Sequence, residues 1–232
     1  MIVKRLSVVV PVFNEEKTIE KIIKKVERAD IGKVKKEIII VDDGSTDGTR
    51  EILEKLSNKY KVIFHKKNQG KGTALRTGFE RCTGEVVVVQ DADLEYEPKD
   101  FKKMLEKIGI KGTRVVYGSR RLTREKIEHG GWIYFWGGTF LNFLTNILYG
   151  LKITDEATCY KMIDRKLLDS LKLKCKRFEF CPEVTAKIAK SGQKIEEVPI
   201  SYRGRKRVDG KKIKLRDGVE AIWTLVKYRL LK

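Results

Sequence analysis

Two aspartates separated by one residue follow the most apolar run of the sequence. Asp91 and Asp93 come just after Val86–Val89, and Glu95 follows two residues later. In an extended chain, residues two apart point to the same side, so both aspartate carboxylates face one way. Adjacent carboxylates repel each other unless a hard cation lies between them, and oxygen ligands suit Mg²⁺ or Mn²⁺. The spacing therefore predicts a divalent metal site, with Glu95 as a further ligand. A purely structural alternative is that these acids cap the helix expected near Pro98.

Polar residues also follow other expected strands. Asp42 and Asp43 begin a turn that leads into a helix, and either carboxylate could accept hydrogen bonds from a ribose or a base. The turn Asn68–Gly72 contains Lys71, whose ammonium group and neighbouring amides suit a phosphate, although a plain loop is an equal interpretation. Phe13–Glu15 follows the first expected strand, and Gly118–Arg120 follows the last of the five. Because such residues follow four separate strands, the pattern indicates one site.

The elements that must position these residues alternate between strand and helix. The expected strands are Leu6–Val12, Glu37–Val41, Lys61–Phe64, Val86–Val89 and Val115–Tyr117. Apolar residues at helical spacing predict helices over Thr18–Val26, around Ile52–Leu56, over Gly72–Cys82 and from Pro98 onward. This alternation predicts an α/β fold, with a nucleotide-binding, mostly parallel sheet flanked by helices. In such sheets, ligands bind beyond the carboxyl ends of the strands, where the polar residues fall.

Charge and cysteine content narrow the class of protein. The 232 residues have a net charge of +19, which favours an anionic partner, although a heat-adapted, lysine-rich surface would give the same balance. We exclude nucleic acid, because the acidic strand ends would repel a polyanion and no RRM, KH or zinc-finger signature is present. We also exclude a sugar nucleotidyltransferase, whose Gly-rich basic signature is missing from Pro11–Glu16. The four cysteines form no CxxC pair and no signal-peptide pattern opens the chain, so we expect a cytoplasmic protein with free thiols.

Several short segments together form a specific pattern over residues 5 to 230. They are Val10–Glu16, Val41–Asp47, Asn68–Gly72, Gln90–Leu94, Gly118–Arg120, Thr154–Asp155, Thr158–Lys161 and Glu197–Ile200. In these segments the chain resembles the family 2 inverting glycosyltransferases of GT-A fold, and among them the dolichol-phosphate and polyprenyl-phosphate sugar synthases. Some relatives have Gln where Glu95 stands, and the basic segment after Ser201 matches the family pattern only loosely.

The resemblance implies roles for individual residues. Those expected at the nucleotide-sugar are Pro11, Val12, Phe13, Asn14, Glu15, Asp42, Asp43, Lys71, Asp91 and Ala92. Metal binding falls to Asp91, Asp93 and Glu95, and catalysis to Asp93, Arg120 and Asp155. Ser119 and Arg120 are expected at the acceptor phosphate. Apart from the resemblance, the basic run of Tyr202–Lys212 predicts a loop that closes over phosphate through Arg203, Arg205 and Lys211, with a solvated surface loop as the alternative.

The reaction implied is transfer of a hexose to a lipid phosphate. The donor would be GDP-mannose or UDP-glucose, with mannose preferred, and the acceptor a polyprenyl (dolichyl) phosphate. A phosphate monoester has a second pKa near ~6, so its oxygen is anionic at neutral pH and attacks without a general base. A hydroxyl acceptor on a glycan or lipid is the main alternative, and it would need Asp155 as base. Asp155 could equally form a structural ion pair with Lys161 or Arg120.

Two segments predict contact with a membrane. Gly130–Leu151 carries no formal charge, but its glycines and asparagines disfavour a transmembrane span. A helix over Phe135–Leu148 would present an apolar face to an anionic membrane surface, beside an amphipathic helix over Ile222–Lys232. The alternative is that both helices pack internally or in a dimer. We therefore expect a glycosyltransferase domain over residues 1–201, with residues 202–232 forming a basic loop and a helix that packs on it, peripheral on the cytoplasmic face of the membrane.

Overall fold

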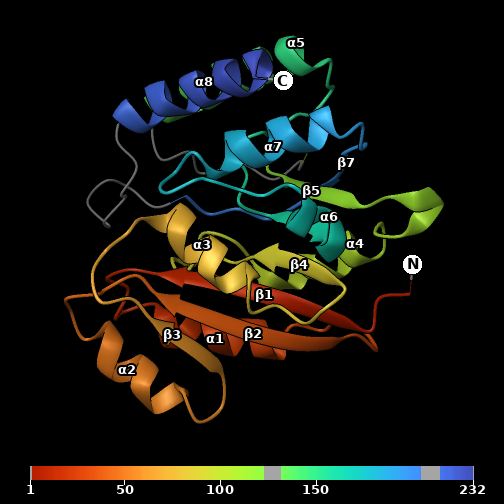
Figure 1. The fold of residues 1–232 in the computed structure, drawn as a ribbon. Helices are drawn as coiled ribbons and strands as arrows, with labels where there is room; N and C mark the ends of the chain where they lie inside the picture. Colours follow the sequence, from red (N-terminus) through yellow and green to blue (C-terminus); the bar gives the residue numbers. More distant parts are fainter. Residues whose placement is uncertain (1, 123–131, 205–214, 232) are drawn as a thin grey trace.

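A computed structural model describes residues 2–122, 132–204 and 215–231, in which the apolar runs form one seven-stranded sheet (Figure 1). The strands are β1 (Arg5–Val12), β2 (Lys35–Asp42), β3 (Lys61–Phe64), β4 (Val86–Val89), β5 (Val115–Ser119), β6 (Lys161–Asp164) and β7 (Glu196–Pro199). Their order across the sheet is β3-β2-β1-β4-β6-β5-β7. All neighbours pair in parallel except β6, which is antiparallel to both β4 and β5. The expected α/β class is therefore confirmed.

Helices cover both faces of the sheet because the central strands are apolar on both sides. In β1, Val8 and Val10 belong to one buried cluster, while Val9 belongs to the other. The first cluster contains apolar residues of α1 (Ile19–Arg28), α2 (Thr49–Leu56) and α4 (Phe101–Leu105). The second contains those of α3 (Lys71–Phe79), α6 (Arg165–Ser170) and α7 (Phe180–Lys190). The sheet thus forms a rigid middle layer between two helical layers.

Two further helices lie outside this sandwich. α5 (Trp132–Tyr149) and α8 (Leu215–Leu230) pack on each other and on α7, at the top of Figure 1. The Tyr149 hydroxyl donates to the Leu225 carbonyl at 2.7 Å, and the Tyr228 hydroxyl of α8 donates to Glu183 of α7 at 2.8 Å. Among the helices in the described ranges, none combines the length and the apolar character needed to span a bilayer.

The predicted elements and the observed ones differ mainly at their ends and in the second half of the chain. β3 and β4 have the expected bounds, and β1, β2 and β5 are longer by one to three residues. The helix expected from Pro98 consists of a 3₁₀ turn, η1 (Pro98–Asp100), followed by the short α4. β6 and β7 were not predicted, because β6 contains buried charged residues in place of an apolar run. The division at residue 201 stays a prediction.

Candidate functional site

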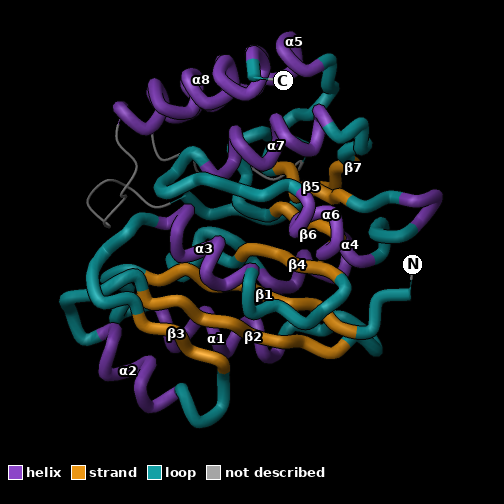
Figure 2. Tube along the Cα trace, viewed as in Figure 1, coloured by secondary structure: helices purple, strands orange, loops and turns teal. Residues whose placement is uncertain are grey.

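The carboxyl ends of four strands lie along one edge of the sheet. β1, β2 and β4 are mutually parallel, and β5 has the same direction because β6 is antiparallel to both β4 and β5. The loops after β1 and β2 gather on the left of Figure 2. The polar residues that follow the four strands are therefore brought to one edge, as their positions in the sequence predicted.

The loops after β1 and β2 are joined by side-chain hydrogen bonds. Asn14 has a left-handed backbone conformation, with φ of 51°, and its backbone amide donates to the Ser45 hydroxyl at 3.0 Å. Its side-chain oxygen accepts from the Thr46 amide at 2.8 Å. The Glu15 amide donates to the Thr49 hydroxyl at 2.8 Å. These bonds hold Asn14 and Glu15 against the turn after β2.

Asp42 and Asp43 are both buried, but they have different surroundings. Asp43 accepts from the backbone amides of Gln69 and Gly70, at 2.9 and 2.7 Å, and from His65 at 2.8 Å. It thereby holds the turn that leads to α3. Asp42 Oδ1 accepts from the Ser45 amide at 3.1 Å, whereas Oδ2 has no hydrogen-bond partner in the described structure. An acceptor left in this state suits a donor hydroxyl supplied by a ligand.

Gly44 keeps the turn after Asp43 tight. Its φ of 71° lies in the region that favours glycine, and a Cβ there would be 2.5 Å from the carbonyl carbon of Lys67. Any side chain at this position would push the turn after β3 away from the turn after β2. The close approach of these two turns therefore depends on a residue without a side chain.

Lys71, at the start of α3, reaches the aspartate pair. Its Nζ lies 2.6 Å from Asp91 Oδ1 and 3.2 Å from the sulfur of Cys159. Burial favours the neutral amine, but the charge and hydrogen bond of Asp91, together with Cys159 and Cys181, outweigh it and raise the pKa of Lys71 well above its usual value. Lys71 is therefore a permanent cation at the first carboxylate of the pair.

Asp93 and Glu95 are brought together by a sharp turn. Leu94 between them has φ of 65°, and the Glu95 amide donates to Asp93 Oδ1 at 3.1 Å. The Tyr202 hydroxyl donates to Glu95 Oε2 at 2.8 Å. No group of three or more His, Cys, Asp or Glu side chains in the described ranges is arranged to hold a metal ion by itself. An oxygen set from two or three carboxylates fits Mg²⁺ or Mn²⁺ that takes its other ligands from water and phosphate.

Arg120 and Asp155 form a bidentate ion pair at the end of β5. Arg120 Nε and Nη2 donate to the two oxygens of Asp155 at 2.7 Å each, and the Arg120 amide donates to Oδ2 at 2.9 Å. Burial would raise the pKa of Asp155, but Arg120 outweighs it and holds that pKa below the usual range. The Arg120 guanidinium also lies over the Tyr202 ring, 4.9 Å from its centroid.

The loop that carries Asp155 is held from β7. Glu197 accepts from the amides of Thr154 and Asp155 at 2.8 and 3.2 Å, and from the Thr154 hydroxyl at 3.0 Å. Ser119 and Thr154 share a hydrogen bond of 2.6 Å. Asp155 therefore has little freedom to turn away from Arg120.

Most of the remaining predicted residues lie in the described structure, and two do not. Pro11 and Val12 end β1, and Ala92 is buried between the two aspartates. Phe13 is half-buried after β1, and Arg203 is exposed, with its amide donating to the Glu95 carbonyl at 2.9 Å. Arg205 and Lys211 lie outside the described residues.

Sequence reasoning did not find Tyr202 or the role of Glu197. Tyr202 was only the first residue of a basic segment, and Glu197 only part of a family pattern. Neither has a local signal, because each acts on a residue far away along the chain.

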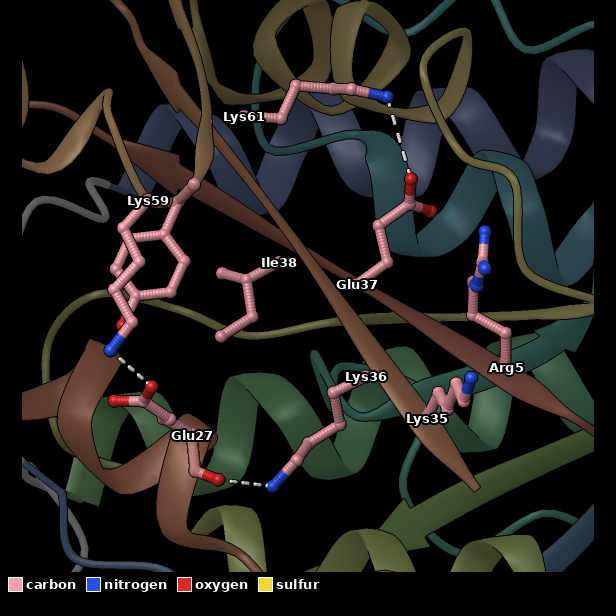
Figure 3. Close-up of a pocket in the computed structure, with 9 residues that line it drawn as sticks. Arg5, Glu27, Lys35, Lys36, Glu37, Ile38, Lys59 and Lys61 are labelled. Atoms are coloured by element: carbon pink, nitrogen blue, oxygen red, sulfur yellow. Dashed lines mark hydrogen bonds and ion pairs between the residues drawn. The ribbon is translucent and has the colours of Figure 1, made fainter. Parts of the chain in front are cut away.

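A separate hollow of about 460 Å³ lies at the opposite edge, near the amino ends of β1 and β2 (Figure 3). Three of the lysines that line it contact other groups of the protein. Lys59 pairs with Glu27, Lys61 lies 3.5 Å from Glu37, and Lys36 donates to backbone carbonyls at the end of α1. These contacts tie α1 to the sheet and give the hollow a structural role.

The chain is similar in sequence to known proteins over most of its length. The family model described as glycosyl transferase family 2 matches residues 7–172. An uncharacterised protein of Methanocaldococcus jannaschii is 32% identical, with 84% of this chain and 80% of that protein covered. A dolichol-phosphate mannosyltransferase of Pyrococcus furiosus is 30% identical over 90% of this chain, which spans 60% of that enzyme. A UDP-N-acetylglucosamine–dolichyl-phosphate N-acetylglucosaminyltransferase of Methanococcus voltae is 29% identical, with 85% of each chain covered.

Among solved structures, the glucosyl-3-phosphoglycerate synthase of Mycobacterium tuberculosis shares the fold. Its TM-score is 0.73 at 20% identity, with 99% of this chain and 82% of that chain covered. That enzyme has also been solved with Mn²⁺ and UDP-glucose, and with Mg²⁺ and UDP. The sheet and its helices therefore have the GT-A architecture.

Proposed function

This chain belongs to glycosyl transferase family 2, and from that premise we propose that it transfers a hexose from a nucleotide-sugar to a polyprenyl phosphate. The observation that carries the proposal is the ion pair between Arg120 and Asp155. Asp155 is buried, both of its oxygens accept from Arg120, and its pKa lies below the usual range. A carboxylate in this state is a poor proton acceptor, whereas a hydroxyl acceptor would require a base. A phosphate acceptor, which is already anionic, requires none.

In the proposed reaction, Asp155 positions Arg120 and Arg120 contacts phosphate. Asp155 accepts from both the guanidinium and the backbone amide of Arg120 at the end of β5, so the guanidinium is preorganised to stabilise negative charge on phosphate. Lys71 offers a second cation near the aspartate pair. Both would stabilise the departing nucleoside diphosphate while the lipid phosphate attacks the anomeric carbon from the opposite side. In-line attack inverts the configuration of that carbon.

The donor site we propose lies between the loops after β1, β2 and β4. Asp42 Oδ2 would accept from a ribose hydroxyl, which would supply the hydrogen bond that it lacks in the described structure. Because the Asp42 side chain is fully covered, the nucleotide must displace part of the neighbouring turn to reach it. Pro11, Phe13 and Glu15 would lie around the base.

Asp93 and Glu95 would hold Mg²⁺ or Mn²⁺, with Asp91 as the third candidate ligand. Such an ion supplies positive charge for the diphosphate leaving group. Lys71 occupies Asp91 Oδ1 in the described structure, so Asp91 would become available as Lys71 moves to the phosphates. The turn at Leu94 brings the Glu95 amide to the Asp93 carboxylate, which fixes the path of the chain between the two acids.

The acceptor's lipid chain would approach along α5 and α8. Trp136, Phe140, Phe143 and Ile147 form an exposed stripe at helical spacing on α5, and Trp223 is exposed on α8. Leu144 and Leu148 of the same helix are half-buried. With the basic residues of α8, this surface suits peripheral binding to anionic lipid. We place it on the cytoplasmic face, where reducing conditions suit the free thiols.

The test is a transfer assay with purified protein. Radiolabelled GDP-mannose, UDP-glucose and UDP-N-acetylglucosamine are each offered with Mn²⁺, with and without polyprenyl phosphate. We expect label in the lipid phase only with the acceptor, and mannose as the preferred sugar, as in the name of the Pyrococcus furiosus relative. Transfer to a polyprenol or a glycan hydroxyl, with none to polyprenyl phosphate, would support the alternative in which Asp155 is the base.

A further inference from the structure

Tyr202 lies between the two halves of the candidate site. Its hydroxyl donates to Glu95 Oε2 at 2.8 Å, on the metal-binding side. Its ring lies under the Arg120 guanidinium, which is 4.9 Å from the ring centroid, on the side of the leaving group. Glu95 and Arg120 follow different strands, so a single side chain spans the gap between β4 and β5 at this edge.

The position of Tyr202 is fixed by backbone contacts on both sides. Tyr202 forms an isolated antiparallel bridge with Tyr96, and the Arg203 amide donates to the Glu95 carbonyl at 2.9 Å. The preceding Ser201 amide donates to Asp100 Oδ2 at 2.7 Å. The ring also packs edge-on against Tyr96, with 5.1 Å between centroids. Tyr202 therefore holds its hydroxyl at Glu95 with little freedom, and a preorganised donor orients a carboxylate better than a mobile one.

The contact between Tyr202 and Glu95 is directional, because the phenol O–H donates and the carboxylate oxygen accepts. A neutral phenol that donates to one carboxylate oxygen fixes the plane of that carboxylate. It also leaves the net charge of Glu95 in place for a cation.

We propose that Tyr202 is the positioning residue of the site, which orients Glu95 through its hydroxyl and Arg120 through its ring. The inference rests on the proposed function, because it assigns Glu95 to the metal and Arg120 to the leaving diphosphate. It adds a residue that touches neither the metal nor the sugar. The alternative is that Tyr202 contributes only packing between β7 and the segment after β4.

The experiment measures Mn²⁺ binding directly, by the loss of the free-ion EPR signal in the presence of GDP or UDP. Tyr202→Phe keeps the ring and removes the hydroxyl, so we expect Mn²⁺ affinity to fall about 10- to 100-fold, the usual effect of losing a partner that orients a ligand. In a Glu95→Ala background the same change should have no further effect. Tyr202→Leu should in addition lower kcat at saturating Mn²⁺, because Arg120 loses the ring.

Tyr228→Phe is the matched control. The Tyr228 hydroxyl donates to Glu183 Oε1 at 2.8 Å, the same bond at the same length, but between α8 and α7. This variant should lose comparable stability in thermal unfolding and retain Mn²⁺ affinity. Wild-type affinity in Tyr202→Phe would overturn the inference, as would an equal loss in Tyr228→Phe. A wild-type protein that binds no Mn²⁺ with either nucleotide would instead contradict metal use in the proposed function.

Discussion

Lys71 Nζ lies 2.6 Å from Asp91 Oδ1, so the first carboxylate of the Asp-Ala-Asp motif is neutralised by a cation of the protein itself. This pair joins the start of α3 to the end of β4. It lowers the negative charge that a divalent ion would meet at the motif. In the proposed reaction, the arriving diphosphate gives Lys71 an alternative anion and releases Asp91 at the moment when the metal is needed.

Lys71→Met should therefore separate metal binding from donor binding. Without the ammonium group, we expect the affinity for Mn²⁺ in the absence of nucleotide to rise by about 10-fold, because a repelling charge has been removed from the site. The affinity for the nucleoside diphosphate should fall by a similar factor. EPR titration of Mn²⁺ and calorimetry with GDP or UDP measure the two effects. Asp93→Asn is the control that should lose Mn²⁺ affinity. Unchanged or weaker Mn²⁺ binding in Lys71→Met would refute the idea that Lys71 leaves Asp91 for the diphosphate.

Asp155→Asn tests whether Asp155 positions Arg120 or acts as a base. Breaking one side of a buried ion pair costs about 3 kcal/mol in unfolding free energy, and transfer should fall at every pH. The pH profile should keep its inflection near the second pKa of the acceptor phosphate, about 6. A base role predicts instead that the inflection disappears with the carboxylate. Asp164→Asn is the control, because Asp164 pairs with Arg114 at the other end of β5 and should affect stability without affecting transfer.

The ion pair between Arg120 and Asp155 also makes the unfolding free energy depend on pH. The pKa of Asp155 is lower in the folded protein than its usual value of 3.8, so the stabilisation it gives is present above that value. This stabilisation is lost as the pH falls through the folded pKa. Asp155→Asn should therefore have a flatter unfolding free energy below pH ~4 than the wild type.

The local sequence pattern was sufficient to predict the strands that position the site residues. It was insufficient to predict the contacts between their side chains. The four valines of β4 and the apolar run of β1 place Asp91 and Asn14 after buried strands, and parallel pairing then brings them to one edge. β6 was missed because Lys161 and Asp164 are charged yet buried. Lys161 is satisfied by the carbonyls of Glu156 and Thr158, at 2.6 Å each, which no periodicity can reveal.

Contacts between distant segments were equally hidden. Tyr202 and Glu95 are 107 positions apart, and the side-chain bond between them depends on β7 lying beside β5. The sequence left open whether Asp155 pairs with Lys161 or with Arg120. In the structure both Asp155 oxygens accept from Arg120, while Lys161 donates to backbone carbonyls. Such contacts follow from the tertiary arrangement and leave no trace in local spacing.

The exposed stripe on α5 and Trp223 of α8 predict membrane binding that can be removed by mutation. Phe143 and Trp223 are 59% and 63% exposed, and burying one such side chain contributes about 1.5–3 kcal/mol. Phe143→Glu with Trp223→Glu should lower flotation with anionic liposomes by at least about 10-fold. Ile110→Glu is the control, since Ile110 is 53% exposed but lies in η2 (Ile110–Gly112), away from both helices. Equal flotation of the double variant would point to another surface, and resistance of the wild type to an alkaline wash would indicate insertion across the bilayer.

Glu156 gives the fold a pH dependence that can be tested apart from activity. Its carboxyl is fully buried, and burial raises its pKa from 4.5 to about 8. The groups that face it are Lys161 of β6, Cys181 and Thr185 of α7 and its own neighbour Asp155, and the lowering effects of Lys161 and Thr185 do not offset burial.

A folded state that holds this proton more tightly than the unfolded state loses stability as the pH rises. The free energy of unfolding should therefore fall between pH 4.5 and about 8, by up to a few kcal/mol in total. Glu156→Gln should flatten the curve in this window and be more stable than the wild type at pH 8. Urea denaturation from pH 5 to pH 9 measures the slope.

Glu183 is the matched control, because it is equally buried but has partners. Burial would raise its pKa, yet Lys187, the Lys174 amide and Tyr228 outweigh burial and lower it. Glu183 therefore contributes a pH dependence of the unfolding free energy with the opposite sign. Its stabilisation is present above pH ~4.5 and is lost as the pH falls through the folded pKa. Glu183→Gln should therefore destabilise the protein at pH 8, where Glu156→Gln stabilises it. If both variants shift stability in the same direction at that pH, Glu156 does not bind its proton more tightly in the folded protein.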